Sequence, residues 1–254
     1  MITTSYIMHT GKVNKTQEDS ILIDGEVIQD SFDKALCKSF DIPSIFALSD
    51  GIAGMIYGEV ASRKILEYLY ELYTKNSSFS SIVSHIKTTQ DKLAFLSTTN
   101  PKYYGMGATL AGLLIEDRRA RVFNVGDSRV YLYRDMKLQR LSVDHTVARN
   151  MHKKGELESS EDCANIYKML DSAIVADEEA DDFEIHTLSL ELKKGDRLLI
   201  CTDGVTDMIE EPSIEALFQK GNKAEQIALE LFKKAMKNGG EDNLSLIVLE
   251  NFSI

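Results

Sequence analysis

The feature that most constrains this fold is the order of two apolar patterns along the chain. Apolar residues at alternate positions indicate strands, and apolar residues every three or four positions indicate helices. Strand patterns come first, followed by two helices, more strands, a polar stretch, further strands, two helices and a final strand. The expected strands lie near residues 5–8, 20–23, 45–49, 109–115, 121–125, 130–133, 197–201 and 244–249.

The expected helices form two pairs, near residues 58–74 and 79–97 and near 213–218 and 223–237. In the first helix, Val60, Ile65 and Leu69 recur at helical spacing, which predicts one buried face. Helix pairs placed between runs of strands, without regular alternation of single strands and helices, favour an α+β fold built in layers.

Composition excludes several classes of protein. The formal net charge of −11 argues against a nucleic-acid-binding surface, which needs clustered basic residues. The widely spaced Cys37, Cys163 and Cys201 suggest neither a disulfide framework nor a zinc site. The chain has no apolar run long enough to span a membrane, and its first residues lack the pattern of a signal peptide. We therefore expect one cytoplasmic domain that acts neither in a membrane nor on nucleic acid.

Five aspartates lie at the edges of expected strands, and four of them stand beside or close to a glycine. Taken singly, each is best explained as a turn or a helix cap. Together they predict a site, because loops at strand ends converge on one edge of a rigid sheet. The five are Asp19 in "QEDSILI", Asp50 in "FALSDG", Asp127 in "VFNVGDSR", Asp203 in "LLICTDG" and Asp242 in "GGEDNLSLIVL".

Such a cluster of carboxylates needs a cation. Two unit charges about 4 Å apart repel by roughly 4 kcal/mol at an effective dielectric constant near 20. Ligand sets made of oxygen favour Mg²⁺ or Mn²⁺ over zinc. Asp24-Gly25 serves as an internal control, because apolar alternation continues on both sides and predicts a plain hairpin turn. The acidic stretch within residues 147–184 is interpreted as a surface segment, with calcium binding as the weaker alternative.

Six ordered stretches then carry a resemblance that covers almost the whole chain. The sequence resembles the metal-dependent protein serine/threonine phosphatases of the protein phosphatase 2C type, and their compact bacterial members in particular. The stretches are "TGKVNKTQEDSILI", "FALSDGIAGMIYGEVAS", "YYGMGATLAGLLI", "RVFNVGDSRVYLYRDMKLQRLSVDHT", "RLLICTDGVTDMI" and "GGEDNLSLIVLE".

The resemblance implies a fold and an activity. The fold would be two packed antiparallel β-sheets flanked by helix pairs, an α-β-β-α layered sandwich. It would form one phosphatase domain over residues 1–254, with a flap at about 146–182 that lies over the site. The activity would be hydrolysis of phosphoserine and phosphothreonine in proteins by a metal-activated water. The implied partners are a phosphoprotein substrate and a serine/threonine kinase or its targets, and we expect a monomer.

The resemblance also implies residue roles. Asp50 would bridge two Mn²⁺ or Mg²⁺ ions, with the Gly51 carbonyl on one ion and Asp203 and Asp242 on the other. This makes Asp50, Asp203 and Asp242 the expected catalytic set. Asp19, with Glu18 beside it, would lie at or just outside the metal shell. Asp127 would hold a third ion together with Asp203, and His145 is expected to be structural or close to the flap.

One position departs from the family pattern. Relatives place a phosphate-binding arginine five residues before the first aspartate, and here that position is Asn14. Loss of a charge-assisted contact costs about 1.5–3 kcal/mol. Lys12 and Lys15 are the candidates to replace it, so the expected substrate-binding residues are Asn14, Lys12 and Lys15. The departure leaves an alternative open, a catalytically weak phosphatase-like scaffold that binds a phosphoprotein or a regulatory partner.

Overall fold

Two six-stranded antiparallel sheets pack face to face in the computed structural model, which describes residues 1–52, 55–76, 78–155, 169–180 and 182–250. A third, two-stranded sheet pairs β6 (Gly107–Ala108) with β11 (Ile174–Val175). In order across the first sheet, the strands are β10 (Lys137–Arg140), β9 (Arg129–Arg134), β13 (Arg197–Cys201), β14 (Leu244–Glu250), β1 (Ile2–His9) and β4 (Phe32–Phe40). Across the second sheet they are β12 (His186–Glu191), β8 (Arg119–Val125), β7 (Leu110–Glu116), β5 (Ser44–Ser49), β2 (Ser20–Ile23) and β3 (Glu26–Ile28).

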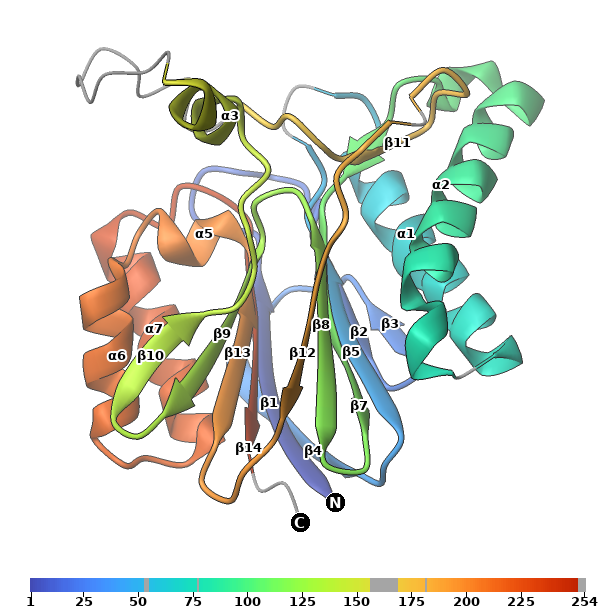
Figure 1. Ribbon diagram of the computed structural model, residues 1–254. Coiled ribbons are helices and arrows are strands. Elements are labelled where there is room, and N and C mark those ends of the chain that lie inside the picture. Colours follow the sequence, from blue (N-terminus) through green and yellow to red (C-terminus); the bar gives the residue numbers. More distant parts are fainter. Residues whose placement is uncertain (53–54, 77, 156–168, 181, 251–254) are drawn as a thin grey trace.

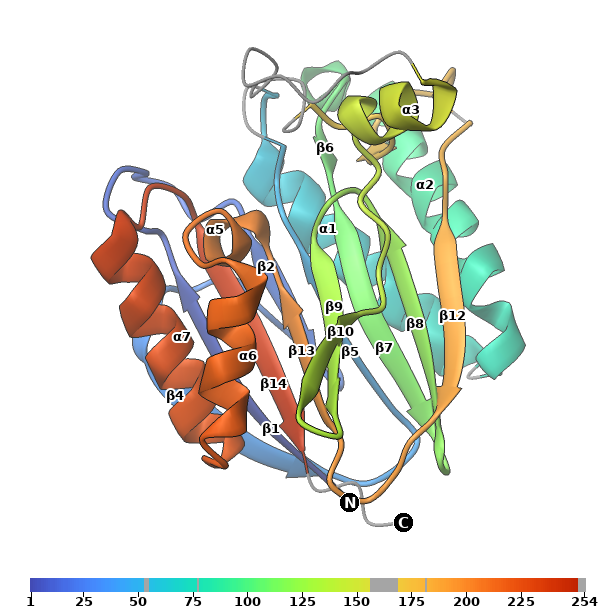
Figure 2. The same ribbon diagram turned by 60° about the vertical axis from the view of Figure 1, so that its left-hand side comes forward.

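Helices cover the outer faces of both sheets (Figure 1). The helices α1 (Gly58–Lys75) and α2 (Ile82–Thr99) lie on the second sheet. The helices α6 (Glu211–Gln219) and α7 (Ala224–Asn238) lie on the first sheet, beside the short α5 (Asp203–Thr206) (Figure 2). The chain therefore forms four layers, in the order helix, sheet, sheet, helix.

The central strands are buried on both faces because a sheet covers one side and helices cover the other. Phe46 of β5 and Ile247 of β14 point into the core between the sheets. Their neighbours Ile45 and Leu246 belong to the two outer cores beneath the helices. Successive side chains of a strand alternate between faces, so a strand buried on both sides becomes a nearly continuous apolar run. This explains why "SIFALS" and "LSLIVLE" are clear strand signals.

The structure confirms the predicted α+β sandwich and adds elements that the sequence pattern did not indicate. Three of them are edge strands, namely β4, β10 and β12. Edge strands keep one side open to solvent, so polar residues interrupt their apolar alternation. Residues 79–81 form a 3₁₀ turn before α2, and the helix begins at Ile82 without a side-chain cap from a serine.

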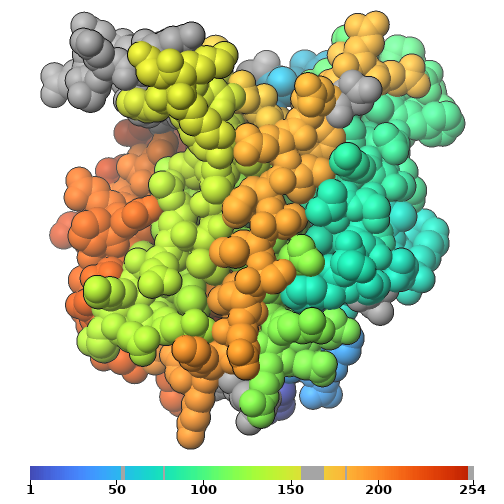
Figure 3. Space-filling view, in the orientation of Figure 1, coloured from blue at the N-terminus to red at the C-terminus, as the bar shows by residue number. Residues whose placement is uncertain are grey.

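The segment predicted as a flap also contains structure. It includes the helix α3 (Val147–Lys154), which lies above one end of the sheets, and the short strand β11. Figure 3 shows the following stretch as orange atoms that continue from that end down the face of the molecule, between the green strands and the teal helix layer. Residues 156–168 and 181 of the predicted flap, which include Cys163, lie outside the described residues.

Two further sequence expectations concern cysteines and membranes. Cys201 is a free thiol in the outer core, and Cys37 is free and exposed on β4. Among the described helices, none combines the length and the hydropathy that a membrane span requires.

Candidate metal centre

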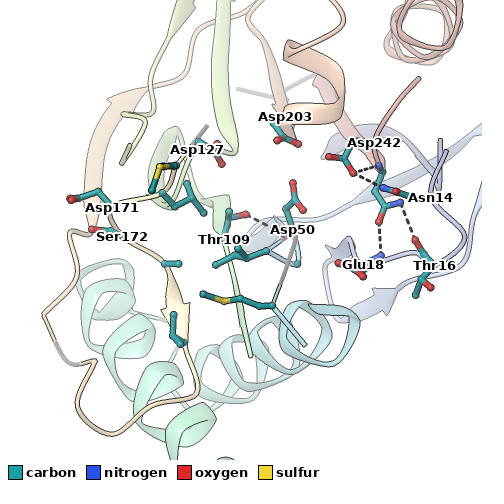
Figure 4. Close-up of a pocket in the computed structure, with 18 of the residues that line it drawn as sticks. Asn14, Thr16, Glu18, Asp50, Thr109, Asp127, Asp171, Ser172, Asp203 and Asp242 are labelled. Carbon is teal, nitrogen blue, oxygen red and sulfur yellow. Dashed lines mark hydrogen bonds between the residues drawn. The ribbon is translucent and has the colours of Figure 1, made fainter. Parts of the chain in front are cut away.

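A pocket of about 730 Å³ opens at the end of the sheets beneath α3 and brings four aspartates together (Figure 4). Asp50 follows β5, Asp127 follows β8, Asp203 follows β13 and Asp242 precedes β14. β5 and β8 both pair antiparallel with β7 and therefore run in the same direction, and β13 pairs antiparallel with β14. The ends of β5, β8 and β13 and the start of β14 thus line one pocket. The predicted convergence of strand-end carboxylates is therefore present in the structure.

The backbone at Asp50 is fixed on both sides. Its N–H donates to Thr109 Oγ1 at 3.1 Å, and its carbonyl accepts from the Thr109 N–H at 2.8 Å. The Gly51 N–H donates to the Glu18 carbonyl at 3.2 Å. A Cβ on Gly51 would stand 2.7 Å from the backbone of Gly58 at the start of α1, so a larger residue does not fit. This close approach requires glycine beside the aspartate.

A second close approach holds Asp203 beside the start of β14. A Cβ on Gly204 would lie 2.0 Å from the Asn243 carbonyl oxygen, so only glycine lets these two strand ends touch. Asn243 in turn ties its own loop to the loop between β1 and β2. Its side chain accepts from the Glu18 N–H at 2.6 Å and donates to the carbonyls of Thr10 and Thr16 at 3.0 Å each.

Asp242 is oriented by two donors to the same oxygen. Its Oδ1 accepts from the Asn243 N–H at 2.7 Å and from Asn14 Nδ2 at 2.7 Å. Oδ2 takes neither of these bonds, which leaves one carboxylate oxygen for a ligand in the pocket. Figure 4 shows Asn14, Glu18 and Thr16 together on this side.

Asp19 lies fully buried behind the pocket lining. Its Oδ2 accepts from Thr202 Oγ1 at 3.1 Å, whereas Oδ1 is buried and makes no hydrogen bond within the described residues. Burial, with the nearby charge of Asp203, raises the pKa of Asp19 to about 7, although the neighbouring Ser245, Asp50 and Thr202 side chains oppose the rise. A buried carboxylate oxygen without a donor is costly unless a cation lies near it.

The other carboxyl groups of the cluster also have raised pKa values. Burial, followed by the charges of Asp19 and Asp203, raises the pKa of Asp50 well above its ordinary value. Burial and the charge of Asp203 raise the pKa of Asp127 to about 7. Burial, with the charges of Glu59 and Asp242, also raises the pKa of Glu18. Bound divalent cations would remove this repulsion, so the donor set fits Mg²⁺ or Mn²⁺.

The side chains of the cluster do not complete the ligand shell of a metal ion by themselves. Within the described part of the chain, no three acidic, histidine or cysteine side chains surround one point closely enough to hold an ion alone. Each ion would therefore need a backbone carbonyl or water beside its carboxylates. Mg²⁺ in proteins usually keeps several waters and uses one or two carboxylates. Gly51, whose carbonyl the sequence predicted as a ligand, is among the lining residues.

The predicted substrate-binding residues separate into two groups. Asn14 and Lys15 line the pocket, and Lys15 carries the single basic side chain among its described lining residues. Lys12 is not part of the lining, because its ammonium group donates to the Met236 carbonyl near the end of α7. The structure therefore does not bring Lys12 to the site, contrary to the sequence-based expectation.

Some residues that support the site were not predicted from the sequence, and His145 was predicted only in a structural role or close to the flap. Thr109 Oγ1 lies 2.8 Å from Ser128 Oγ, which links the Asp50 loop to the loop that carries Asp127. His145 Nδ1 accepts from the Gly126 N–H at 3.0 Å, next to Asp127. Burial lowers the pKa of His145 to about 4 and keeps the ring neutral. The motif glycines mark these loops, but no local pattern marks the pocket wall of residues 169–173.

Comparison with known proteins agrees with this architecture. A family model described as protein phosphatase 2C matches residues 19–237, which is most of the chain. The serine/threonine phosphatase stp of Listeria monocytogenes is 26% identical over 217 residues, covering 83% of this chain and 85% of that protein. The serine/threonine protein phosphatase PstP of Mycobacterium tuberculosis is 28% identical over 210 residues, which are 81% of this chain but 40% of PstP.

Solved structures show the same fold. Stp1 from Staphylococcus aureus superposes with a TM-score of 0.81 at 22% identity, covering 99% of this chain and 95% of that one. The catalytic domain of PstP, determined with two manganese ions, superposes with a TM-score of 0.75 at 24% identity, covering 98% and 99%. The predicted resemblance is confirmed by the family match over residues 19–237. The chain belongs to the protein phosphatase 2C family.

Proposed function

We propose that Asp50, Gly51, Asp203 and Asp242 form the two-metal centre of a phosphatase that hydrolyses phosphoserine and phosphothreonine in proteins. As a member of the protein phosphatase 2C family, the chain is a metal-dependent protein serine/threonine phosphatase. The observation that carries the proposed roles is the meeting of four aspartates from four strand ends in one pocket. Asp19, buried behind them with an oxygen that lacks a donor, supports a cation at this place.

The ligands have distinct places in the proposed centre. Asp50 would be shared by the two ions, and the Gly51 carbonyl would serve one of them. Asp203 and Asp242 would hold the other ion, with Asp19 and Glu18 at or just outside the shell. We propose a third site between Asp127 and Asp203, since both line the pocket and the charge of Asp203 raises the pKa of Asp127. Mn²⁺ and Mg²⁺ both suit such oxygen ligands.

The residues of the chain prepare the site for a phosphate anion. When bound, the ions supply a nucleophilic water and offset the negative charge of the phosphoryl oxygens. Thr109 and the Glu18 carbonyl keep the Asp50-Gly51 backbone in place, and Asn14 and Asn243 fix the rotamer of Asp242. Lys15 adds the single positive side chain of the described lining, so we assign it to the substrate phosphate.

The setting of this activity is also part of the proposal. We place the chain in the cytoplasm as a monomeric signalling phosphatase, a single domain with a flap at about residues 146–182. Its substrate is a phosphoprotein, and the reaction opposes that of a serine/threonine kinase, acting on the kinase or on its targets. The acidic pocket and the net charge of −11 favour a protein substrate over nucleic acid.

Asn14 is the observation that favours the second candidate, a scaffold that binds a phosphoprotein without turnover. Its amide is already engaged by Asp242, so the chain lacks an arginine fork for phosphate at this position. Phosphate release from phosphoserine, phosphothreonine and phosphotyrosine peptides in Mn²⁺ separates the two. The phosphatase releases phosphate from the first two peptides in preference to the third. Binding of the peptides without phosphate release would favour the scaffold.

A further inference from the structure

The pocket has an apolar wall on the side away from Asn14 and Glu18. Figure 4 shows Asp171 and Ser172 on this far side, and most of the lining residues around them in the chain are apolar. The wall is defined by the apolar lining residues Ile52, Met55, Met169, Leu170, Ala173 and Val175. These residues have no role in holding metal ions, since their side chains offer no oxygen ligand.

The pocket is also larger than a phosphoryl group requires. Its volume of about 730 Å³ falls in the range of sites that enclose a drug-sized ligand. A phosphorylated side chain at the metal centre therefore leaves the space along the apolar wall for another part of the substrate. The wall and the metal centre belong to one continuous cavity, so both would contact the same peptide.

Two methionines of the wall are exposed to solvent. Met169 is 56% exposed and Met55 is 39% exposed, and Ile56 and Tyr57, at 56% and 38%, continue the apolar surface beside Met55. A group of large apolar side chains exposed beside a cleft commonly marks a binding surface. Methionine suits such a surface because its flexible, polarizable side chain adapts to partners of different shape.

The wall is held in position before any substrate binds. Gln90 of α2 accepts from the Val175 N–H at 2.9 Å and donates to the Val175 carbonyl at 2.7 Å. The Met169 carbonyl accepts from the Val147 N–H at 2.8 Å, and β11 pairs with β6. A preformed wall spares the substrate the cost of ordering it, which increases the affinity gained from each contact.

The charges around the wall define what it accepts. Asp171 lines the pocket on the wall side, and Glu18 lines the opposite side. An acidic residue next to the phosphorylated one would be repelled by both carboxylates. From the wall, its exposed methionines and these charges, we infer that the site selects phosphoproteins with an apolar side chain adjacent to the phosphorylated residue. The inference rests on the proposed phosphatase function and adds the sequence preference of its substrate.

Three phosphothreonine peptides test the inference. They are identical except that leucine, serine or glutamate occupies both positions that flank the phosphothreonine. Burial of a leucine side chain predicts a kcat/KM at least roughly tenfold higher for the leucine peptide than for the serine peptide. The gain appears mainly in KM, because the contact already forms in the ground state. The glutamate peptide is the poorest substrate of the three.

Variants then assign the preference to the wall. In the double variant Met55→Ser, Met169→Ser, the leucine-to-serine ratio of kcat/KM falls toward one. The matched control is Met136→Ser, a methionine that is 58% exposed in the turn after β9 and outside the pocket lining, and it keeps the ratio. Both peptides are compared on the same enzyme preparation, so any loss of folded protein cancels in the ratio.

Each outcome decides the inference. Discrimination in the wild type that is lost in the double variant and kept in Met136→Ser supports it. Equal rates for leucine and serine peptides in the wild type overturn it while leaving the phosphatase function standing. The inference is also overturned, with the phosphatase function left standing, if the double variant keeps the discrimination or if Met136→Ser loses it. If the wild-type protein releases phosphate from none of the three peptides in Mn²⁺, the phosphatase function and this inference are both overturned.

Discussion

At the scale of single residues, Asp24 and Asp50 show how the same dipeptide serves two purposes. Each is followed by glycine. Asp24 and Gly25 have φ angles of 44° and 108° and connect β2 to β3 in a tight hairpin. Asp50 follows β5 on the way to α1, and its carboxylate joins three other aspartates in the pocket. Asp50 is therefore a site residue and Asp24 a turn residue.

Replacing Asp50 tests this difference. Asp50→Asn should lower the turnover of a phosphopeptide at least roughly hundredfold, equivalent to about 2.7 kcal/mol of transition-state stabilisation. The metal-free variant should unfold at the same or a higher temperature, because one source of carboxylate repulsion is removed. Asp24→Asn is the matched control and should retain turnover, since asparagine also tolerates a positive φ. Turnover of Asp50→Asn within tenfold of wild type would contradict the assignment.

Asn14 acts, in this account, on Asp242 rather than on substrate. Asn14→Ala removes one of the two donors to Asp242 Oδ1, so the ligand becomes less well oriented. We expect the Mn²⁺ concentration for half-maximal activity to rise roughly tenfold, as is typical when a group that orients a metal ligand is lost. Calorimetric titration with Mn²⁺ measures the affinity directly. Lys12→Ala, on the same loop but outside the lining, should leave the Mn²⁺ affinity unchanged.

If Asn14→Ala instead raises KM for the phosphopeptide while Mn²⁺ affinity stays constant, Asn14 contacts the phosphate. That result would support the substrate-binding role that the sequence predicted for Asn14.

At the scale of elements, α2 supports the pocket through one buried side chain. Gln90 is 4% exposed and reaches the backbone of Val175 and the carbonyl of Ala180. These contacts join a helix to a segment 85 residues later in the chain. The strand β11 pairs with β6 through only two residues, and Gln90 adds contacts that hold it against α2.

Gln90→Leu tests the dependence. The substitution keeps the side chain similar in size but removes its amide, so the Val175 N–H loses its partner, whereas the Val175 carbonyl still accepts from the Asp177 N–H. We expect the free energy of unfolding to fall by about 1–3 kcal/mol. KM for peptides should rise more than kcat falls, because the pocket wall loosens while the metal ligands stay in place. Gln219→Leu, a substitution on the exposed side of α6, is the control, and an equal rise of KM in it would contradict the account.

The way the elements pack explains which of them could be predicted from the sequence. The central strands and the helix pairs were predictable because burial on one or both faces leaves a regular apolar pattern. The edge strands β4, β10 and β12 were not, because solvent on one side allows charged residues such as Lys38 and Arg140. The aspartates could be found because each adjoins a strand end in a motif. The pocket wall could not, since contacts such as Gln90 with Val175 leave no local pattern.

At the scale of the whole molecule, negative charge is concentrated where the substrate must bind. The chain carries a formal charge of −11, and the pocket lining includes Glu18, Asp171 and four aspartates of the proposed metal centre. A phosphate anion would be repelled from this surface without cations. Metal ions therefore serve both the folded state, by relieving repulsion, and the attraction of the substrate.

The raised pKa values predict how the metal-free protein responds to pH. Asp19 and Asp127 have pKa values of about 7 when folded, and both are above the ordinary carboxyl value. Between the ordinary carboxyl pKa and about 7, the folded state holds more protons than the unfolded state. Stability therefore falls as pH rises through this window. Asp127→Asn should weaken this fall, measured by urea unfolding of chelated protein at pH 5 and pH 8.

Mn²⁺ should oppose the same fall in the wild type, because it binds the carboxylates in their charged form. His145, neutral when folded with a pKa of about 4, has the opposite slope in both proteins and cancels in the comparison of variant with wild type. An identical pH dependence in wild type and Asp127→Asn would contradict the assigned repulsion.

The most direct test of the central claim is phosphate release from a phosphothreonine peptide while divalent ions are removed and restored. The account predicts that exhaustive chelation abolishes turnover, that Mn²⁺ restores it, and that circular dichroism shows the chain folded throughout. Restoration should fail in Asp50→Asn and succeed in Asp24→Asn. Undiminished turnover after complete chelation would contradict a metal centre built from the pocket aspartates.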